Sequence, residues 1–203
     1  TVVRDYFEDI QGFATTTPPS AALIKAALLN GAVDMGYGYE AYDSSTRPSG
    51  QVHYGGRNMQ GWGYLNVEQA ITPRAPRSFF FDDFTNITNS THQSTMGTNG
   101  TGDYVQYTVN VVDSSEPLKV TLTWTDYQDG NDAYAVNNLN LLVTSPGSTT
   151  YYGNNFTGSW SVTGGSYDTK NNTEAVYLQS PATGTWTIRV TDASHGTGTQ
   201  PFA

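Results

Sequence analysis

The sequence predicts an α+β chain in which a short helical and loop segment precedes an antiparallel β-sandwich. Within the first 75 residues, apolar side chains recur every three to four positions, which is typical of helices. From about residue 105 onward, apolar and polar residues alternate, which is typical of half-buried strands. The change of period falls near Pro73–Arg77, a segment with the composition of a linker. We therefore expect two domains, residues 1–75 and residues 78–203.

Helical signals occur in three places. Apolar residues follow one face of Val2–Ile10. Ser20 has the chemistry of an N-cap and precedes the compact apolar segment Ala21–Leu29. A third, short helix is expected over Leu65–Ile71. The intervening segment Tyr37–Arg57 is rich in Gly, Tyr and Ser and predicts a long loop.

Strand signals fill the second part of the chain. In each strand one face carries apolar residues and the other carries polar ones, so one face is expected to be buried and the other exposed. Turn residues separate the segments, and many short strands with such turns predict a sandwich or a jelly roll. The predicted strands are Val105–Val111, Leu118–Trp124, Leu139–Thr144, Tyr151–Gly153, Ala175–Gln179 and Trp186–Val190.

Composition argues against two classes of partner. The chain has 18 acidic and 9 basic residues, a formal net charge of −9, and no basic cluster. Such a chain repels phosphate backbones, so we expect no nucleic-acid partner. No apolar run approaches the ~18–20 residues that span a bilayer, so we expect no membrane span. The sequence contains no cysteine, so packing or a bound metal has to stabilise the fold.

Several segments together resemble one protein family. Pro19–Ala32 resembles the helix that follows the nucleophile helix in subtilisin-like (subtilase) serine proteases. Asn58–Asn66 is similar to the Gln-Gly-Trp-Gly turn with which many such catalytic domains finish, and Gln200–Ala203 is similar to the start of a last strand. The segments that resemble the β-jelly-roll appended to alkaline subtilases are Leu118–Asp126, Asn137–Pro146, Tyr151–Phe156, Glu174–Pro181 and Gly184–Val190.

The resemblance implies the C-terminal part of a secreted, extracellular serine endopeptidase. In that family Ser attacks the peptide carbonyl, His acts as general base and Asp orients the His. Thr1–Ile10 would be the rear of the nucleophile helix, so these catalytic residues precede the chain, which we expect to be inactive alone. The implied partners are the N-terminal remainder of the protease and a polypeptide substrate. The N-terminus does not resemble a signal peptide, which also predicts a fragment.

Motif searches on the residues themselves find no catalytic set. His53, His92 and His195 lie in Gly- or Thr-rich surroundings, outside any nucleophile or metal motif. An alternative function is an extracellular carbohydrate- or protein-binding (adhesion) sandwich, because aromatic side chains on such a surface stack on sugars or dock polypeptides. The same aromatics also suit a core or its rim. They are Tyr151, Tyr152, Phe156, Trp160 and Tyr167.

An acidic loop predicts a Ca²⁺ site. Asp126, Asp129 and Asp132 fall within seven residues directly after a strand, and Ca²⁺ takes six to eight oxygen ligands. The resembled jelly roll carries Ca²⁺ in such loops, but this chain has Asn138 and Asn140 where the family has Asp, which should weaken a site. The alternative is that these residues only form turns. The candidate metal ligands are Asp126, Asp129, Asp132, Asn138 and Glu174.

Overall fold

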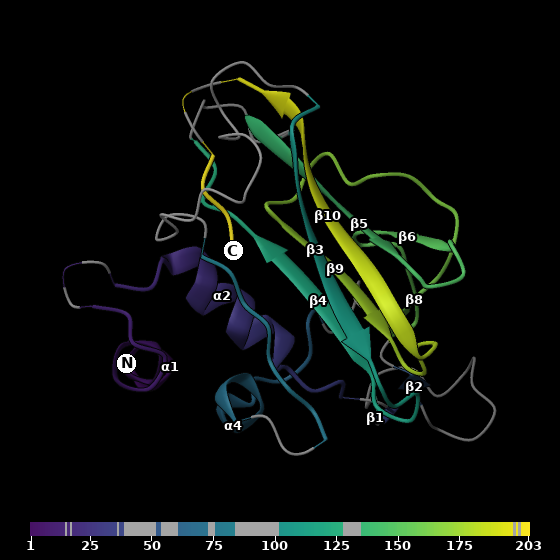
Figure 1. The fold of residues 1–203 in the computed structure, drawn as a ribbon, viewed down its shortest axis with the longest axis horizontal. Coiled ribbons are helices and arrows are strands. Elements are labelled where there is room, and N and C mark those ends of the chain that lie inside the picture. Colours follow the sequence, from purple (N-terminus) through teal and green to yellow (C-terminus); the bar gives the residue numbers. More distant parts are fainter. Residues whose placement is uncertain are drawn as a thin grey trace.

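The computed structural model shows two facing β-sheets with helices against one of them (Figure 1). It describes residues 1–14, 16, 18–35, 37–38, 52–53, 61–72, 76–83, 102–127, 135–196, 198 and 200–203. The described chain is mostly antiparallel sheet with a few short helices. The predicted α+β class with a sandwich-like β part is confirmed at this level.

The larger sheet has four antiparallel strands in the order β3-β10-β5-β6, and the sheet that faces it has two, β4 and β9. Two further pairs of very short strands, β1-β2 and β7-β8, lie outside these layers. The strands are β1 Tyr37–Gly38, β2 Val52–His53, β3 Tyr104–Val111, β4 Leu118–Thr123, β5 Asn137–Thr144, β6 Thr150–Tyr152, β7 Phe156–Thr157, β8 Trp160–Ser161, β9 Thr173–Leu178 and β10 Gly184–His195.

The core lies between the two sheets and follows the predicted alternation. Leu139, Leu141 and Val143 point inward from β5 and are fully buried. Two tryptophans fill the space between the layers, and each satisfies its indole N–H on a backbone carbonyl. Trp124 donates to Asn137 O at 2.9 Å, and Trp186 donates to Ala182 O at 2.7 Å.

Among the described residues, three helices belong to the first part of the chain: α1 Val2–Asp9, α2 Ala21–Asn30 and α4 Val67–Ile71. Ser20 caps α2 as predicted, since its Oγ accepts the Leu23 N–H at 3.0 Å. Within the described residues, no helix combines the length and the apolar character that a membrane crossing requires.

Helix α2 covers the outer face of the β4–β9 sheet through polar contacts (Figure 1). Thr123 Oγ1 donates to Ala22 O at 2.6 Å. At the other end of the helix, Lys119 Nζ donates to Asn30 O at 3.2 Å and Tyr177 OH donates to Leu29 O at 3.0 Å. Lys119 and Tyr177 thus bind carbonyls of the last turn of α2, which lack partners within the helix. The expectation that the polar face of β4 is exposed was therefore wrong.

Two other elements differ from the sequence prediction. The expected loop Tyr37–Arg57 contains a short antiparallel pair in which Tyr37 lies opposite His53; most of this segment lies outside the described residues. Strand β10 runs beyond the predicted Val190 to His195, with a bulge between Asp192 and Ser194. Asp192 continues the inward face of Trp186, Ile188 and Val190, so it lies on the core side, where it is fully buried.

We predict that the Tyr177 hydroxyl stabilises the contact between helix and sheet. Tyr177→Phe removes the donor to Leu29 O and the contact with Thr121 Oγ1 at 3.1 Å. Because the Leu29 carbonyl then keeps only the Ala32 N–H at 3.2 Å, the free energy of unfolding should fall by about 1 kcal/mol in urea titrations. Tyr151→Phe is the matched control: its ring packs on Trp186, and no described residue hydrogen-bonds its hydroxyl. Equal losses in both variants would contradict the assignment.

Candidate functional site

Asp126, the first residue of the predicted calcium loop, binds backbone amides. Its Oδ1 accepts the Asn137 N–H at 2.9 Å, and its Oδ2 accepts the Val136 N–H at 2.7 Å. The carboxylate therefore pins the start of β5 to the end of β4. This is the turn-forming role that was the alternative to calcium binding.

A buried amide network continues from this point. Asn137 is fully buried; its Oδ1 accepts the Gly196 N–H at 2.9 Å, and its Nδ2 donates to Gln200 Oε1 at 3.2 Å. Gln200 in turn donates to Thr125 O at 3.0 Å. These side chains tie the beginning of β5, the end of β10 and the C-terminal segment into one end of the sandwich.

Glu174 lies elsewhere, on the core face of β9. Its Oε2 accepts the Leu141 N–H at 2.7 Å. Strand β6 ends at Tyr152, so it offers no ladder partner to this amide, and the Glu174 carboxyl takes that place. The fit is close, since a Cβ on Gly153 would lie 2.2 Å from Glu174 Oε2.

The second Glu174 oxygen has no partner in the described residues. Glu174 is fully buried, and its Oε1 accepts no hydrogen bond there. Burial raises the pKa of Glu174 to about 8; the Leu141 hydrogen bond opposes this rise and the Asp168 charge adds to it. The side chain therefore retains its proton near neutral pH. An oxygen of this kind is one that a cation could use.

Asp168 is held by amide donors. Its Oδ2 accepts Asn154 Nδ2 at 2.7 Å and Asn171 Nδ2 at 2.6 Å, and its Oδ1 accepts the Lys170 N–H at 2.8 Å. Although burial raises the pKa of Asp168, these hydrogen bonds outweigh it and lower the pKa below the usual value. Asp168 is therefore a stable anion whose oxygens already have N–H partners.

The described members of the predicted calcium set are Asp126, Asn138 and Glu174, and these three do not share one partner or one face. Asn138 projects from the side of β5 opposite the core, where its Nδ2 donates to Asn140 Oδ1 at 3.3 Å and its buried Oδ1 has no partner among the described residues. Glu174 projects into the core. Asp129 and Asp132 lie outside the described residues. Asn138 Oδ1 and Glu174 Oε1 are therefore the described oxygens still available, fewer than Ca²⁺ takes.

In the part of the chain that the structure describes, no three His, Cys, Asp or Glu side chains come together to hold a metal ion. The calcium site remains a prediction that rests on the loop that follows Asp126.

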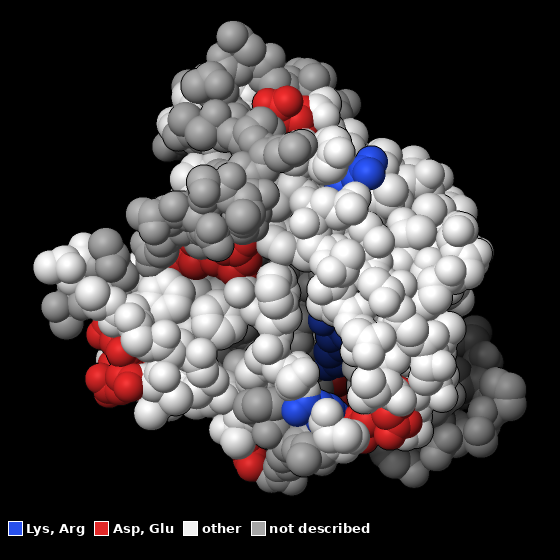
Figure 2. Space-filling view, viewed as in Figure 1, with Lys and Arg blue, Asp and Glu red and all other residues white. Residues whose placement is uncertain are grey.

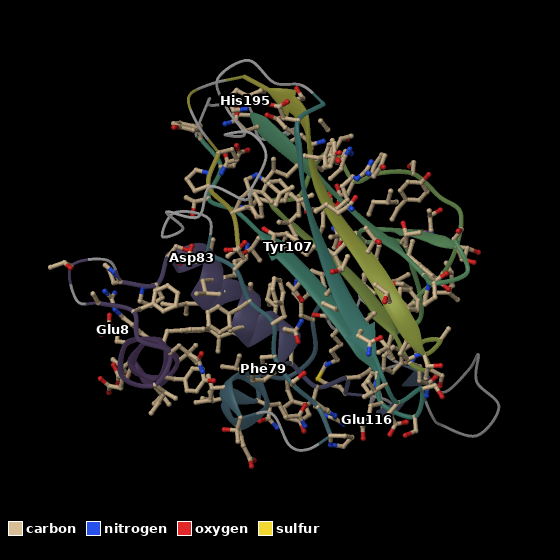
Figure 3. The ribbon with its side chains drawn as sticks, viewed as in Figure 1. Glu8, Phe79, Asp83, Tyr107, Glu116 and His195 are labelled. Atoms are coloured by element: carbon tan, nitrogen blue, oxygen red, sulfur yellow. The ribbon has the colours of Figure 1, made fainter. Side chains whose placement is uncertain are left out.

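An Asp–His pair lies at the same end of the sandwich as the Asn137 network, because His195, labelled in Figure 3, is the strand partner of Asn137. His195 Nδ1 is 2.9 Å from Asp192 Oδ2, and His195 Nε2 contacts Gly198 O. Burial raises the pKa of Asp192, and the His195 charge opposes the rise. Both ring nitrogens face oxygen atoms of the chain, so the pair acts as a structural tie between β10 and the segment after it. Sequence reasoning missed it because the two residues lie three positions apart in an alternating strand.

Four of the five aromatic residues considered for ligand stacking pack on other rings. Tyr151 belongs to the core, with its ring 6.1 Å from that of Trp186. Phe156 packs edge-on against Tyr177, and Tyr152 packs edge-on against Tyr167 at 4.6 Å. Only Tyr167 of this group counts as exposed. The rings thus form the core and its rim.

Comparison of the chain with protein-family models and with curated proteins gives no match.

We predict that Glu174 makes stability depend on pH. Below its unfolded pKa of 4.5 both states hold the proton; between pH 4.5 and 8 only the unfolded state ionises, so the free energy of unfolding falls as pH rises. Glu174→Gln retains the acceptor for Leu141 and cannot ionise. The free energy of unfolding of this variant, measured in urea titrations, should equal that of the parent at pH 4.5. At pH 8 it should exceed that of the parent by on the order of a few kcal/mol. Glu8→Gln, on the exposed side of α1, should leave the profile unchanged within about 0.5 kcal/mol. A constant difference between Glu174→Gln and the parent across this range would contradict the assignment.

We also predict that Ca²⁺ raises the melting temperature of metal-free protein. A ligand that binds only the folded chain adds about 2.7 kcal/mol at a hundredfold excess over Kd. The measurement compares melting in millimolar Ca²⁺ and in EGTA; Mg²⁺ should replace Ca²⁺ poorly because it requires a tighter octahedron. Asp129→Ala should remove the shift, whereas Asp9→Ala, on α1, should retain it. Melting that ignores Ca²⁺ would leave the acidic residues as turn formers.

Proposed function

We propose that the chain is the non-catalytic C-terminal part of a secreted subtilisin-like serine endopeptidase. Its β part would be the jelly roll that accompanies alkaline members of that family, where it stabilises the enzyme or docks the polypeptide substrate. The proposal combines the ordered resemblance of several segments with two features of the helical part.

The observation that carries the proposal is the small core of the helical part. Its buried apolar cluster centres on Val3, Phe7 and Leu23. Around it, Val2 and Leu65 are each 59% exposed and Ile10 is 70% exposed. Exposed large apolar side chains in this part of the chain would gain burial from a further protein surface. In this proposal that surface belongs to the N-terminal remainder of the catalytic domain.

The second feature is the turn that resembles the end of a subtilase catalytic domain. Gly63 has φ +100° and approaches Val33 so closely that a Cβ would lie 2.1 Å from Val33 O. The Trp62 ring packs edge-on against Phe156 at 6.3 Å and Tyr177 at 6.0 Å. The same turn therefore contacts the β part, which suits a β-domain that stabilises the domain before it.

A fluorophosphonate probe tests the proposal, because it labels activated serines. The purified chain should react with no serine and should not cleave casein or a peptide p-nitroanilide, since the family's nucleophile would precede Thr1. The complete reading frame that contains the chain should be labelled at one serine upstream of Thr1, located by mass spectrometry of the peptides. Stoichiometric labelling within residues 1–203, or a complete protein without a reactive serine, would refute the proposal.

A further inference from the structure

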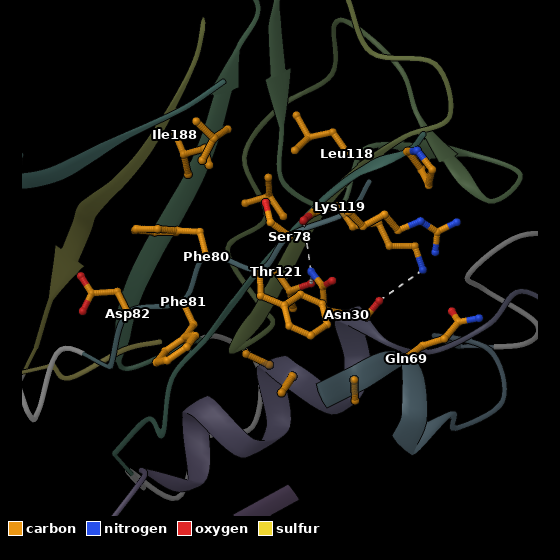
Figure 4. A pocket seen from close by; sticks show the side chains of 18 of the residues that line it. Asn30, Gln69, Ser78, Phe80, Phe81, Asp82, Leu118, Lys119, Thr121 and Ile188 are labelled. Atoms are coloured by element: carbon orange, nitrogen blue, oxygen red, sulfur yellow. Dashed lines mark hydrogen bonds between the residues drawn. The ribbon is translucent and has the colours of Figure 1, made fainter. Parts of the chain in front are cut away.

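Asn30 and Gly31 form an Asn–Gly pair at the point where helix α2 ends against strand β4. The side-chain amide of Asn30 binds the strand, since its Nδ2 donates to Lys119 O and to Thr121 Oγ1, both at 3.1 Å (Figure 4). In return, Lys119 Nζ donates to Asn30 O at 3.2 Å. The two N–H groups of this amide thus both have acceptors on β4.

Gly31 is required for a different reason, the close approach of helix α4. A Cβ at position 31 would lie 2.4 Å from the Ala70 nitrogen and 2.8 Å from its Cβ, so a larger residue does not fit. The Gly31 N–H donates to Ala27 O at 3.0 Å and closes the last turn of α2. Because Asn30 serves β4 and Gly31 serves α4, the fold keeps these two residues adjacent.

An Asn–Gly sequence is chemically labile, because glycine has no side chain to hinder an attack by its own backbone nitrogen. The Gly31 nitrogen, once it has lost its proton to a base in the solvent, forms a bond to Asn30 Cγ. The Cγ–Nδ2 bond breaks, ammonia leaves, and a five-membered succinimide ring remains. Water then opens the ring at either carbonyl and yields aspartate or isoaspartate. The net reaction consumes one water and releases one ammonia.

The folded geometry blocks this reaction at two points. Ring closure needs the Gly31 nitrogen, whose N–H is bound to Ala27 O. It also needs Asn30 Cγ to turn toward that nitrogen and away from the strand that holds the side-chain amide. Both conditions are met only when the end of α2 unwinds and leaves β4, a local opening of the kind that folded proteins undergo at low population.

We propose that Asn30 is a deamidation site, whose reaction is gated by the separation of α2 from β4 and makes that separation permanent. Aspartate has no N–H to give to the Lys119 carbonyl, and its charge meets the negative end of the α2 dipole. Isoaspartate adds a methylene to the backbone beside Gly31, where α4 leaves no space. The inference goes beyond the proposed function and does not depend on it.

Lys119 offers the new carboxylate an alternative partner. Asn30 and Lys119 both line the groove in which Figure 2 shows basic side chains, and Lys119 Nζ already donates to Asn30 O and, at 3.0 Å, to Ala32 O. A carboxylate that turned to Nζ would still leave the Lys119 carbonyl without the Asn30 amide. An ion pair at a partly exposed position offsets only part of that loss.

Peptide mass spectrometry of the chain, incubated at mildly alkaline pH, tests the gate. In urea that unfolds the chain, Asn30 should deamidate as fast as Asn99, which precedes Gly100 in the second Asn–Gly pair of the sequence. In the folded chain, deamidation of Asn30 should be at least tenfold slower than in urea, because it waits for local opening.

Two threonine variants test whether β4 holds the gate. Thr121→Val removes an acceptor of Asn30 Nδ2 and the contact of Tyr177 OH at the same interface, so deamidation of the folded chain should quicken about fivefold. Thr108→Val makes the same change at an exposed position of β3 and should alter the rate by less than about twofold.

Asn30→Asp reproduces the aspartyl product and tests its effect on the fold. Its melting temperature at neutral pH should lie about 2–4 °C below that of the parent. Asn110→Asp adds the same charge at an exposed position of β3 and should melt within about 1 °C of the parent. Deamidation of folded Asn30 at the urea rate, equal rates in the two threonine variants, or equal melting of the two aspartate variants would overturn the proposal.

Discussion

The structure depends on one geometric constraint: two strands, β4 and β9, face an inner surface that four strands build. A two-stranded sheet has little stability without further cover, because one of its faces and both of its edges remain open. The chain supplies that cover from distant segments. Helix α2 lies on the outer face, Phe81 packs on the helices 5.1 Å from Phe7, and Phe202 joins the core beside Trp124. The helical part and the β part thus stabilise each other.

This constraint also explains why a polar face is buried. Lys119, Thr121 and Thr123 alternate with the core residues of β4, and alone they would be solvated. Against α2 they become hydrogen-bond partners for helix carbonyls and for Asn30. Net hydrogen bonds of this kind contribute about 1 kcal/mol each, but an unpaired buried group costs more, so the interface tolerates little change in register. Specific polar pairing therefore helps to set the position of α2 on β4.

The sequence allowed the local elements to be predicted because their causes are local. The Ser20 cap and the alternation in β4 led to nearly correct bounds for both elements. Long-range relations leave no such period. The cover of β4 by α2 joins residues about a hundred positions apart, as in the bond from Thr123 to Ala22.

The candidate site was harder still to predict. Strict alternation would put Asp192 and His195 on opposite faces, and only the bulge beside Ser194 brings them together. Acidic composition alone likewise did not show that Asp126 holds backbone amides, since a turn former and a calcium ligand use the same side chain. Glu174 was chosen for calcium chemistry, but its nearest described partner is a single amide, which only the end of β6 explains.

Side chains complete the backbone hydrogen bonding of two strands in this fold. Where β6 stops, the Glu174 carboxyl completes the hydrogen bonding of β5, and where the outer edge of β4 reaches Lys119, the Asn30 amide does so. A side chain can replace a missing strand at a single position. The N–H and C=O of the next residue that faces the same edge then still need a partner. Between Asn30 and Ala203 that pair belongs to Thr121, for whose N–H and C=O the described part of the chain supplies no hydrogen bond. A backbone amide and carbonyl are costly to bury unless they are paired.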